Sequence, residues 1–357
     1  MSAHFHLLTI SKINRETSDC VSISFSIPPN LSNEFEFKQG QTIAVKTKIH
    51  NQDIRRNYSI CSSPLDNELK IAVKRIPEGL FSNYANDSLK AGDTLEVFPP
   101  AGKFYTELNN TQEKKYLAIA AGSGITPILS IIKTTLAIES KSEFTLMLGN
   151  KTRQSIIFLE ELEALKNKYL TRFNLIHVLS QEKTEDEFHN GRIDSNKLAL
   201  LQKIQNFSAI DEIFICGPQQ LVLDTENYFV GLGIAPKNIH KELFTAKAPV
   251  KGKATKQEFS EGNTSQIIIT VDARQTELEL SIDSDDSILD AAIKKGADLP
   301  YACKGGMCCT CKAKLLEGEV SMDVHWGLEE DEIKNGFILT CQSHPKTKRV
   351  VIDFDIK

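Results

Sequence analysis

Apolar and polar positions follow one rhythm up to about residue 110 and a different rhythm after it. The first part contains short segments such as CVSISFSIP, QTIAVKTKI and LKIAVKRI, with Gly, Pro, Asn and Asp between them. Alternation with a period of two is typical of strands that bury one face. The pattern therefore predicts a small antiparallel β-barrel over residues 1–110.

From Lys115 onward, buried-strand patterns and helix patterns take turns. YLAIAAG, FTLMLGN, RFNLIHVLS and EIFICGP predict strands, whereas TPILSIIKTTLAIE and SIIFLEELEALKNKY predict helices. Strands that alternate with helices favour a parallel sheet covered on both faces. We expect an α/β domain of this kind over residues 111–246.

The segment 247–263 carries lysines, Pro and Gly with almost no apolar residues, which is typical of a linker between domains. After it, QIIITVDA, TELELSI and RVVIDFDI predict strands, and SILDAAIKKG predicts a helix. The pattern predicts a third domain, of the α+β class, over residues 264–357.

Charge is unevenly distributed along the chain. Residues 264–357 hold 11 Lys and Arg against 17 Asp and Glu, which gives −6, whereas the whole chain has a net charge of −5. This balance argues against nucleic-acid binding. It suits docking of the third domain, including its GLEEDEI segment, onto a basic protein surface, although acidic surfaces also serve solubility alone.

Composition also bears on the cellular location. Hydrophobic residues make up 41% of the chain, but no uninterrupted apolar run is long enough to span a membrane. The N-terminal MSAHFHLLTI lacks the basic flank and apolar core of a secretory signal. We expect a cytoplasmic protein without a membrane segment, whose eight cysteines are ligands or core residues and not disulfides.

Four of these cysteines lie in YACKGGMCCTCKAKLLEGEV. Three of them have the spacing C-x4-C-x2-C, and a further Cys follows well downstream, which is the plant-type pattern of a [2Fe–2S] cluster. A zinc site would more often pair two short knuckles. Gly305 and Gly306 let backbone N–H groups approach the sulfurs, and Cys309 is expected to be a bystander. The predicted ligands are Cys303, Cys308, Cys311 and Cys341.

Candidate flavin chemistry lies in RRNYSI. On a strand Arg56 and Tyr58 point to one side, where a guanidinium binds pyrophosphate and a phenol ring stacks on an isoalloxazine, with Ser59 next to them. An exposed Arg and a half-buried Tyr on an ordinary strand would give the same pattern. In VKRIPEGLFSNY a glycine loop opens a short helix and could hold phosphates. Its candidate residues are Val73, Gly79, Phe81 and Ser82.

Candidate nucleotide chemistry lies in AAGSGITPILSII, where a buried strand turns into a helix. Two glycines permit close backbone approach, and a Thr-Pro helix start places the positive end of the helix dipole toward a pyrophosphate. Such turns also occur without a ligand. The candidate residues are Gly122, Ser123, Gly124, Thr126 and Pro127.

Taken together, R-x-Y-S, G-x-F-S, P-A-G-x-F, G-x-G-x-T-P and the later C-G-P resemble the ferredoxin-NADP reductase superfamily. Residues 264–357 resemble a plant-type ferredoxin domain, which implies a β-grasp fold. The resemblance implies FAD in the barrel and a nicotinamide at Cys216, Gly217 and Pro218, with Cys216 near its reactive carbon; a small buried core residue is the alternative for Cys216. It also implies that Phe244 covers the flavin and that Glu242 lies nearby, although Phe244 could simply be a core residue.

The nucleotide is expected to be NADPH, with NADH possible. Arg153 in LGNKTRQS could pair with a 2′-phosphate, and no acidic residue follows Leu148 until Glu160. Arg192 in NGRID matches a position in the superfamily that could also help. The alternative for both arginines is that they are exposed and only solvated.

The domain order resembles reductase components of oxygenases, above all those of phenylacetyl-CoA epoxidase systems. It implies electron flow from the nucleotide through FAD and the cluster to a di-iron oxygenase. Alternatives are a ketosteroid, Rieske or fatty-acid oxygenase, or a ferredoxin or flavodoxin, as the acceptor. A different class of protein would be a zinc-binding interaction module on a nucleotide-binding scaffold, or a regulatory flavoprotein subunit.

Overall fold

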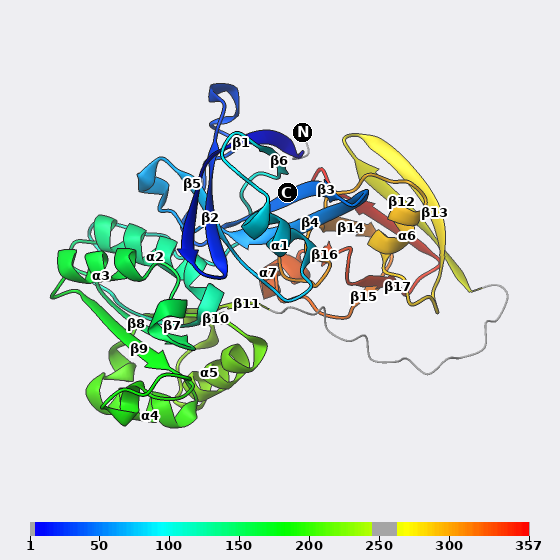
Figure 1. Cartoon of the computed structure of the whole chain (residues 1–357). Helices are drawn as coiled ribbons and strands as arrows, with labels where there is room; N and C mark the ends of the chain where they lie inside the picture. The colour runs from blue at the N-terminus through cyan, green and yellow to red at the C-terminus, as the bar shows by residue number, and fades with distance from the viewer. Residues whose placement is uncertain (1–3, 245–262, 357) are drawn as a thin grey trace.

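The computed structural model describes residues 4–244 and 263–356 and contains three large sheets, each with its own core (Figure 1). In Figure 1 the barrel, drawn in blue and cyan, lies between the green α/β unit and the yellow-to-red C-terminal unit. The three sheets confirm the predicted combination of antiparallel barrel, parallel sheet and α+β domain.

The first sheet is a six-stranded antiparallel barrel in the order β4-β3-β6-β1-β2-β5. A bridge between Ile60 and Ile71 brings its two outer strands together, and apolar side chains such as Ile23 and Ile43 fill the interior. One short helix, α1 (Leu80–Asp87), packs beside it. The strands are β1 (His6–Thr17), β2 (Cys20–Ser26), β3 (Thr42–Ile49), β4 (Gln52–Ser59), β5 (Leu69–Lys74) and β6 (Thr94–Val97).

The second sheet is parallel throughout, in the order β11-β10-β7-β8-β9. Its middle strand divides two cores: Tyr116 and Ala118 face one, and Leu117 and Ile119 face the other, as period-two alternation requires. Its strands are β7 (Lys115–Ala121), β8 (Glu143–Asn150), β9 (Phe173–Leu179), β10 (Glu212–Gly217) and β11 (Ile239–Leu243). The helices on its two faces are α2 (Ile125–Ile138), α3 (Leu159–Lys168), α4 (Ser195–Ile204) and α5 (Gln219–Gly231).

The third sheet, β13-β12-β18-β14-β16, mixes antiparallel pairs with one parallel pair, β12 with β18. Helix α6 packs its apolar residues Ile288 and Leu289 on it. Its strands are β12 (Thr264–Val271), β13 (Arg274–Ser281), β14 (Lys312–Glu317), β16 (Phe337–Leu339) and β18 (Arg349–Asp353). The remaining elements are α6 (Ile288–Lys294), α7 (Glu330–Lys334) and the small pair β15 (Val320–Met322) with β17 (Ser343–Pro345).

Some boundaries differ from the sequence prediction. Helix α3 begins only at Leu159, because Phe158 has a φ of 61° and ends the helical geometry on that side. The apolar pattern did not predict α4, α5 or β11. The boundaries 1–110, 111–246 and 264–357 stay predictions, and the expected linker 247–263 lies outside the described residues except for Asn263. Among the described helices, none has the length and apolar character that crossing a bilayer requires.

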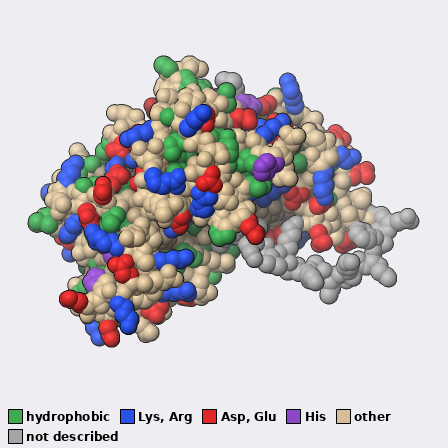
Figure 2. All heavy atoms as spheres, in the orientation of Figure 1, with side chains coloured by type: hydrophobic (Ala, Val, Ile, Leu, Met, Phe, Trp, Pro, Cys, Tyr) green, Lys and Arg blue, Asp and Glu red, His purple; other side chains and the backbone are tan. Residues whose placement is uncertain are grey.

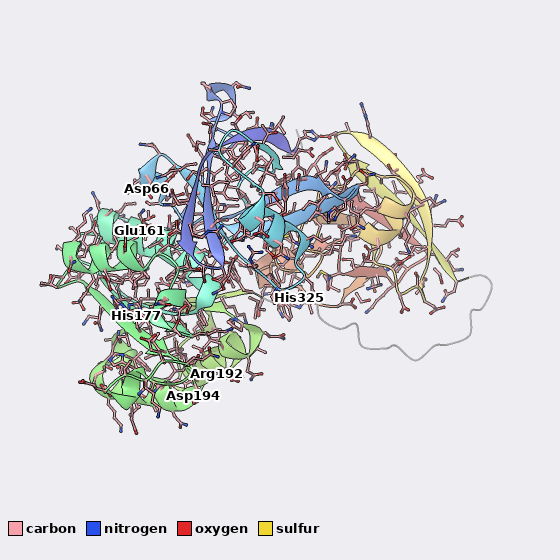
Figure 3. All side chains as sticks on the ribbon, in the orientation of Figure 1. Asp66, Glu161, His177, Arg192, Asp194 and His325 are labelled. Carbon is pink, nitrogen blue, oxygen red and sulfur yellow. The ribbon has the colours of Figure 1, made fainter. Side chains whose placement is uncertain are left out.

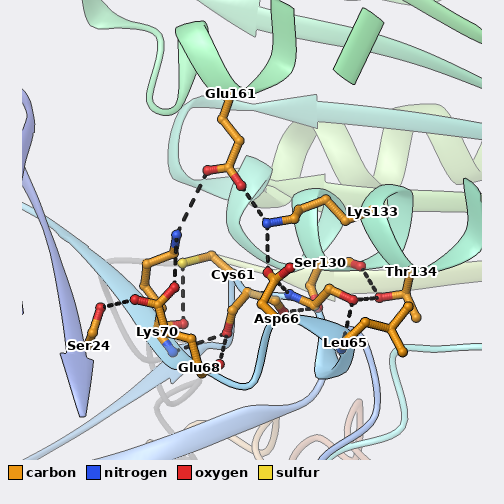
Figure 4. Close-up of polar contacts among 12 residues, drawn as sticks. Ser24, Cys61, Leu65, Asp66, Glu68, Lys70, Ser130, Lys133, Thr134 and Glu161 are labelled. Atoms are coloured by element: carbon orange, nitrogen blue, oxygen red, sulfur yellow. Dashed lines mark hydrogen bonds and ion pairs between the residues drawn. The ribbon is translucent and has the colours of Figure 1, made fainter. Parts of the chain in front are cut away.

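A network of polar side chains joins the barrel to the α/β unit (Figure 4). Lys133 on α2 lies 2.7 Å from Asp66 of the barrel and 2.6 Å from Glu161 on α3, and its side chain is 16% exposed. Lys70 on β5 approaches the same Glu161. The Ser63 and Thr134 hydroxyls form a buried hydrogen bond of 2.9 Å beside them. This network fixes one sheet against the other and so determines where their edges meet.

Candidate functional site

The edges of the three sheets meet at one cleft with a volume of about 1410 Å³. The barrel contributes residues of β4 and of the turn that contains Gly102. The α/β unit contributes the glycine turn after β7 and strand β11, and the C-terminal unit contributes the cysteine loop. Segments far apart in the sequence thus line a single site.

The flavin wall of this cleft is strand β4. Arg56, Tyr58 and Ser59 all line the cleft, and Arg56 is exposed on the same side as the half-buried Tyr58. The centres of the Tyr58 and Phe81 rings lie 5.6 Å apart, and this packing orients the Tyr58 ring. Burial raises the pKa of Tyr58, so the phenol stays neutral and suits stacking on an aromatic ring.

Basic residues that the sequence did not single out extend this wall. Lys74, the last residue of β5, and Arg75, which follows it, also line the cleft, and Arg75 is held by a forked ion pair with Asp87. Figure 2 shows Lys and Arg side chains over the middle of the visible face, near the ends of β2 and α1. In the sequence, the adjacent positions of Lys74 and Arg75 in VKRIPEG could have indicated this basic wall. A basic wall beside a tyrosine fits the diphosphate and ring of FAD.

The loop before α1 has a structural role in addition to any phosphate contact. The Ser82 hydroxyl accepts the Ile76 N–H at 3.1 Å and donates to the Gly79 carbonyl, while Phe81 is buried in the barrel core. Val73 is buried in the same core. The candidate residues Val73, Gly79, Phe81 and Ser82 do not line the cleft, whereas their neighbour Ile76 does. Their side chains therefore stabilise the loop, and a phosphate would contact its backbone.

The glycine turn after β7 fits close backbone approach. A Cβ added to Gly124 would lie 2.2 Å from the Cys216 carbonyl oxygen, so only glycine allows this turn to pack on β10. Gly122 has a φ of 56°. Ser123 and Thr126 line the cleft, and the Thr126 hydroxyl donates to the Ser123 carbonyl at 3.0 Å. Pro127 is buried in the first turn of α2.

Ser59 and Glu242 meet in the wall of the cleft, and Cys216, which is fully buried and does not line the cleft, lies next to them. Ser59 Oγ donates to Glu242 Oε2 at 2.9 Å, and Cys216 Sγ lies 3.9 Å from the same oxygen. Parallel pairing of β10 with β11 puts Cys216 directly beside Glu242. Burial raises the pKa of Glu242 to about 7, although hydrogen bonds from Ser59 and Cys216 lower it. Burial likewise raises the pKa of Cys216, which therefore remains a thiol.

The chain after Cys216 completes this part of the site. Gly217 has a φ of 155°, and its carbonyl accepts the Phe244 N–H at 2.8 Å. Phe244 is half-buried and lines the cleft, and Pro218 caps α5. An aromatic ring therefore lies near the carboxylate and thiol, where it can cover a planar cofactor.

The predicted 2′-phosphate residues lie apart from the cleft lining. Arg153 is exposed, and its guanidinium pairs with Glu163. Its backbone N–H donates to Glu182 Oε2 at 2.7 Å. Arg192 is exposed in the segment between β9 and α4 (Figure 3). The sequence window around Arg153 showed no nearby acid, because both carboxylates come from segments farther along the chain.

The cysteine loop brings its four predicted ligands into two close pairs. Cys308 donates a hydrogen bond to Cys303, and Cys311 donates one to Cys341. These bonds lower the pKa of Cys303 to about 6 and also lower that of Cys341, whereas they raise the pKa of the two donors, Cys308 and Cys311. The Gly305 N–H donates to Cys303 Sγ at 3.3 Å. A Cβ on Gly306 would lie 2.7 Å from a Val324 methyl group, so the loop needs glycine there. Soft thiolates with backbone donors around them fit a [2Fe–2S] cluster.

Cys309 points elsewhere. Its Sγ lies 2.6 Å from the Gly327 carbonyl oxygen, and burial raises its pKa to about 12. Its φ of 53° turns the backbone between Cys308 and the next residue. This geometry agrees with the bystander role predicted for it.

A flavin wall, a nucleotide-binding turn and a cluster loop in one cleft define an NAD(P)H-dependent electron-transfer oxidoreductase. Three family profiles match: an oxidoreductase FAD-binding domain at residues 7–105, an oxidoreductase NAD-binding domain at 118–227 and a 2Fe-2S iron-sulfur cluster binding domain at 270–346. The cofactors are FAD, NAD(P)H and a [2Fe–2S] cluster.

Full-length relatives agree with these profiles. The chain is 45% identical to one of the subunits of 1,2-phenylacetyl-CoA epoxidase of Escherichia coli, over 99% of this chain and 98% of that protein. It is 32% identical to the 3-ketosteroid-9-alpha-monooxygenase ferredoxin reductase component of Rhodococcus rhodochrous, over 98% and 96%. Phthalate dioxygenase reductase shares the fold, with a TM-score of 0.58, 24% identity and 98% coverage of both chains. The chain belongs to the ferredoxin-NADP reductase superfamily, among the members with a ferredoxin domain.

Proposed function

We propose that this chain is the reductase component of a phenylacetyl-CoA epoxidase system and passes electrons from NADPH to a di-iron oxygenase. The observation that carries the proposal is the cleft that Ser59 and Glu242 line together with the cysteine loop, with the buried Cys216 next to Glu242. The full-length similarity to the epoxidase component supports the identity of the acceptor. The bound flavin takes up two electrons as a hydride and releases them singly, which lets a two-electron donor serve a one-electron carrier.

The side chains of this chain supply position and charge for that chemistry. The glycine turn lets a dinucleotide lie close to the backbone, and Tyr58 and Phe244 offer faces on which planar rings stack. Glu242 holds a negative charge at Oε2 when ionised, next to the position expected for the nicotinamide. In this ionised form, Glu242 would stabilise positive charge that develops on a nicotinamide bound beside it.

Most site residues in this proposal retain the roles expected from the sequence, whereas the role of Ser59 rests on its hydrogen bond to Glu242. Arg56 binds the flavin pyrophosphate, Ser59 orients Glu242, and Cys216 contacts the nicotinamide. Arg153 and Arg192 give the preference for NADPH, which their exposed guanidinium groups support. The four cluster ligands are Cys303, Cys308, Cys311 and Cys341.

Two further points belong to the same proposal. The domains extend over residues 1–110, 111–246 and 264–357, as the separate cores of the barrel and of the C-terminal sheet support. The protein works in the cytoplasm as part of phenylacetate catabolism, and its eight free thiols suit a reducing compartment.

A second candidate acceptor is a ketosteroid monooxygenase, supported by the relative that is 32% identical over nearly the full length. Purified oxygenase components of both kinds, mixed with this chain and NADPH, distinguish the two. We expect epoxide formation from phenylacetyl-CoA and no steroid hydroxylation. Steroid hydroxylation without epoxide formation would contradict the proposed acceptor.

A further inference from the structure

The cysteine loop faces the barrel instead of open solvent. Cys308 and Ala302 are buried together with Ala44 and Phe98 of the barrel, and Cys303 packs against the same group. The edge of the cluster site that carries Cys303 and Cys308 is therefore covered by this chain itself. This arrangement favours entry of an electron from the flavin side of the cleft.

Two basic residues of the barrel hold the C-terminal unit in this position. The Arg55 guanidinium lies 4.0 Å from the centre of the Tyr301 ring, its side chain is 10% exposed, and it donates to the Leu299 carbonyl. Lys103 pairs with Glu332 at 3.0 Å and with Glu329 at 3.5 Å. Glu329 and Glu332 of GLEEDEI thus pair with Lys103 of the barrel. Glu332 also pairs with Lys312 of its own domain, and the exposed Glu330 pairs with Lys334.

A third contact closes the same face against the α/β unit. Met307 and Trp326 pack on the apolar core that includes Ile239 and Leu243. Trp326 also lines the cleft, and it is the single Trp of the chain. Its exposure therefore reports whether this face is covered.

We propose that the face around the cysteine loop, with Tyr301, Glu329 and Glu332, also binds the external electron acceptor, so that docking on the barrel and docking on the acceptor exclude each other. This inference rests on the proposed function. Electron transfer slows steeply with distance, so an acceptor must reach the edge of the cluster that Ala44 and Phe98 now cover. The fitting partner is a protein with Lys and Arg around its redox centre, as Arg55 and Lys103 surround the loop here.

The contacts suit a reversible arrangement. Lys103 is 45% and Glu329 63% exposed, so water and salt compete with their ion pair, and exposed pairs of this kind stabilise only weakly. One electron enters the cluster while the face is docked and leaves it after release. Two such cycles consume the two electrons of one NAD(P)H, and no covalent bond to the cluster forms or breaks.

The test uses the holoprotein and cytochrome c, a basic protein that accepts one electron. Lys103→Glu removes an internal partner and leaves the acidic face intact, whereas Glu332→Gln changes the face itself. We expect both variants to slow cluster reduction by the flavin about threefold or more. With the cluster reduced beforehand by dithionite, we expect the KM for cytochrome c to fall in Lys103→Glu and to rise in Glu332→Gln. If the substitutions only disturbed the structure, the KM for cytochrome c would change in the same direction in both variants.

Fluorescence gives a readout independent of activity. Acrylamide quenching of Trp326 is expected to increase in Lys103→Glu and, in the unchanged protein, with added salt. Glu317→Gln is the matched control, because Glu317 pairs with Arg349 at 3.3 Å on an exposed part of the same domain. An unchanged KM for cytochrome c in Glu332→Gln, with slower internal transfer, would overturn the shared face. If NADPH never reduces the cluster of the protein without substitutions, the proposed function itself is wrong.

Discussion

Ser59 Oγ and Glu242 Oε2 lie 2.9 Å apart, although 183 positions separate the two residues in the sequence. Ser59 ends strand β4 of the barrel, and Glu242 lies on β11 of the parallel sheet. Their hydrogen bond ties the flavin wall to the nucleotide wall at the place where Cys216 also points. The following predictions test what this junction and the cysteine loop do.

Hydride transfer is expected to depend on the ionisation of Glu242. Burial raises its pKa to about 7, so the carboxylate charge that favours a developing nicotinamide cation is lost as the pH falls through this value. We expect the rate of flavin reduction to rise severalfold from about pH 6 to about pH 8. Stopped-flow absorbance measures this rate, and Glu242→Gln should give a flat profile. A variant with the same pH dependence as the unchanged protein would assign the titration to another group.

Gly124 is expected to be essential for nucleotide use. In Gly124→Ala the new methyl group would lie 2.2 Å from the Cys216 carbonyl oxygen, so the turn or β10 must shift. We expect the kcat/KM for NADPH to fall about tenfold or more, with flavin and iron content retained. Gly231→Ala is the control, since a Cβ there meets nothing within 4 Å. Equal kinetics in the two variants would show that the turn does not position the nucleotide.

The two adjacent cysteines of the loop are expected to behave differently. Cys308 shares a hydrogen bond with Cys303, whereas Cys309 Sγ lies 2.6 Å from the Gly327 carbonyl oxygen. Cys308→Ser should lose the cluster, and Cys309→Ser should keep about two irons per chain. Iron analysis and the visible spectrum measure this difference. The reverse result would mean that the ligand register is shifted by one residue.

Lys133 is expected to stabilise the junction between the barrel and the parallel sheet. Removing its charge in Lys133→Met leaves Asp66 and Glu161 without this partner in a largely buried site. We expect the temperature at which flavin fluorescence appears to fall by about 5 °C. Lys115→Met is the control, because Lys115 is 53% exposed and lies 3.9 Å from Glu143. A similar fall in both variants would argue against a special role for the network in Figure 4.

Arg153 is expected to govern the choice of nucleotide. Its guanidinium is exposed and could leave Glu163 to pair with a 2′-phosphate. Arg153→Ala should lower the kcat/KM for NADPH about tenfold and leave that for NADH nearly unchanged. Equal losses with both nucleotides would place Arg153 outside the specificity site.

Local motifs carried most of what the sequence could predict. The strand RRNYSI, the glycine turn and the cysteine spacing depend on neighbouring residues, and the predicted three-domain fold is confirmed. The pairing of Ser59 with Glu242 could not be predicted in the same way. It depends on β11 lying beside β10 and on the barrel packing against the parallel sheet, which are long-range relationships.

The acidic segment shows the same limit. Its charge pattern in GLEEDEI indicated a docking surface, but no local pattern could show that Lys103, more than 200 positions earlier, pairs with Glu329 and Glu332. Glu182, which accepts the backbone N–H of Arg153, could not be predicted for the same reason, since it comes from the segment after β9. Charge is visible in a sequence, whereas its partner across domains is not.

The central claim is electron flow from NADPH through the flavin to the cluster and on to the oxygenase. The most direct measurement mixes the holoprotein with NADPH without oxygen and follows flavin absorbance together with the EPR signal of a reduced [2Fe–2S] cluster. We predict that flavin reduction precedes the cluster signal, and that adding the oxidised oxygenase component removes the signal. A flavin that is fully reduced while the cluster stays oxidised would contradict the account.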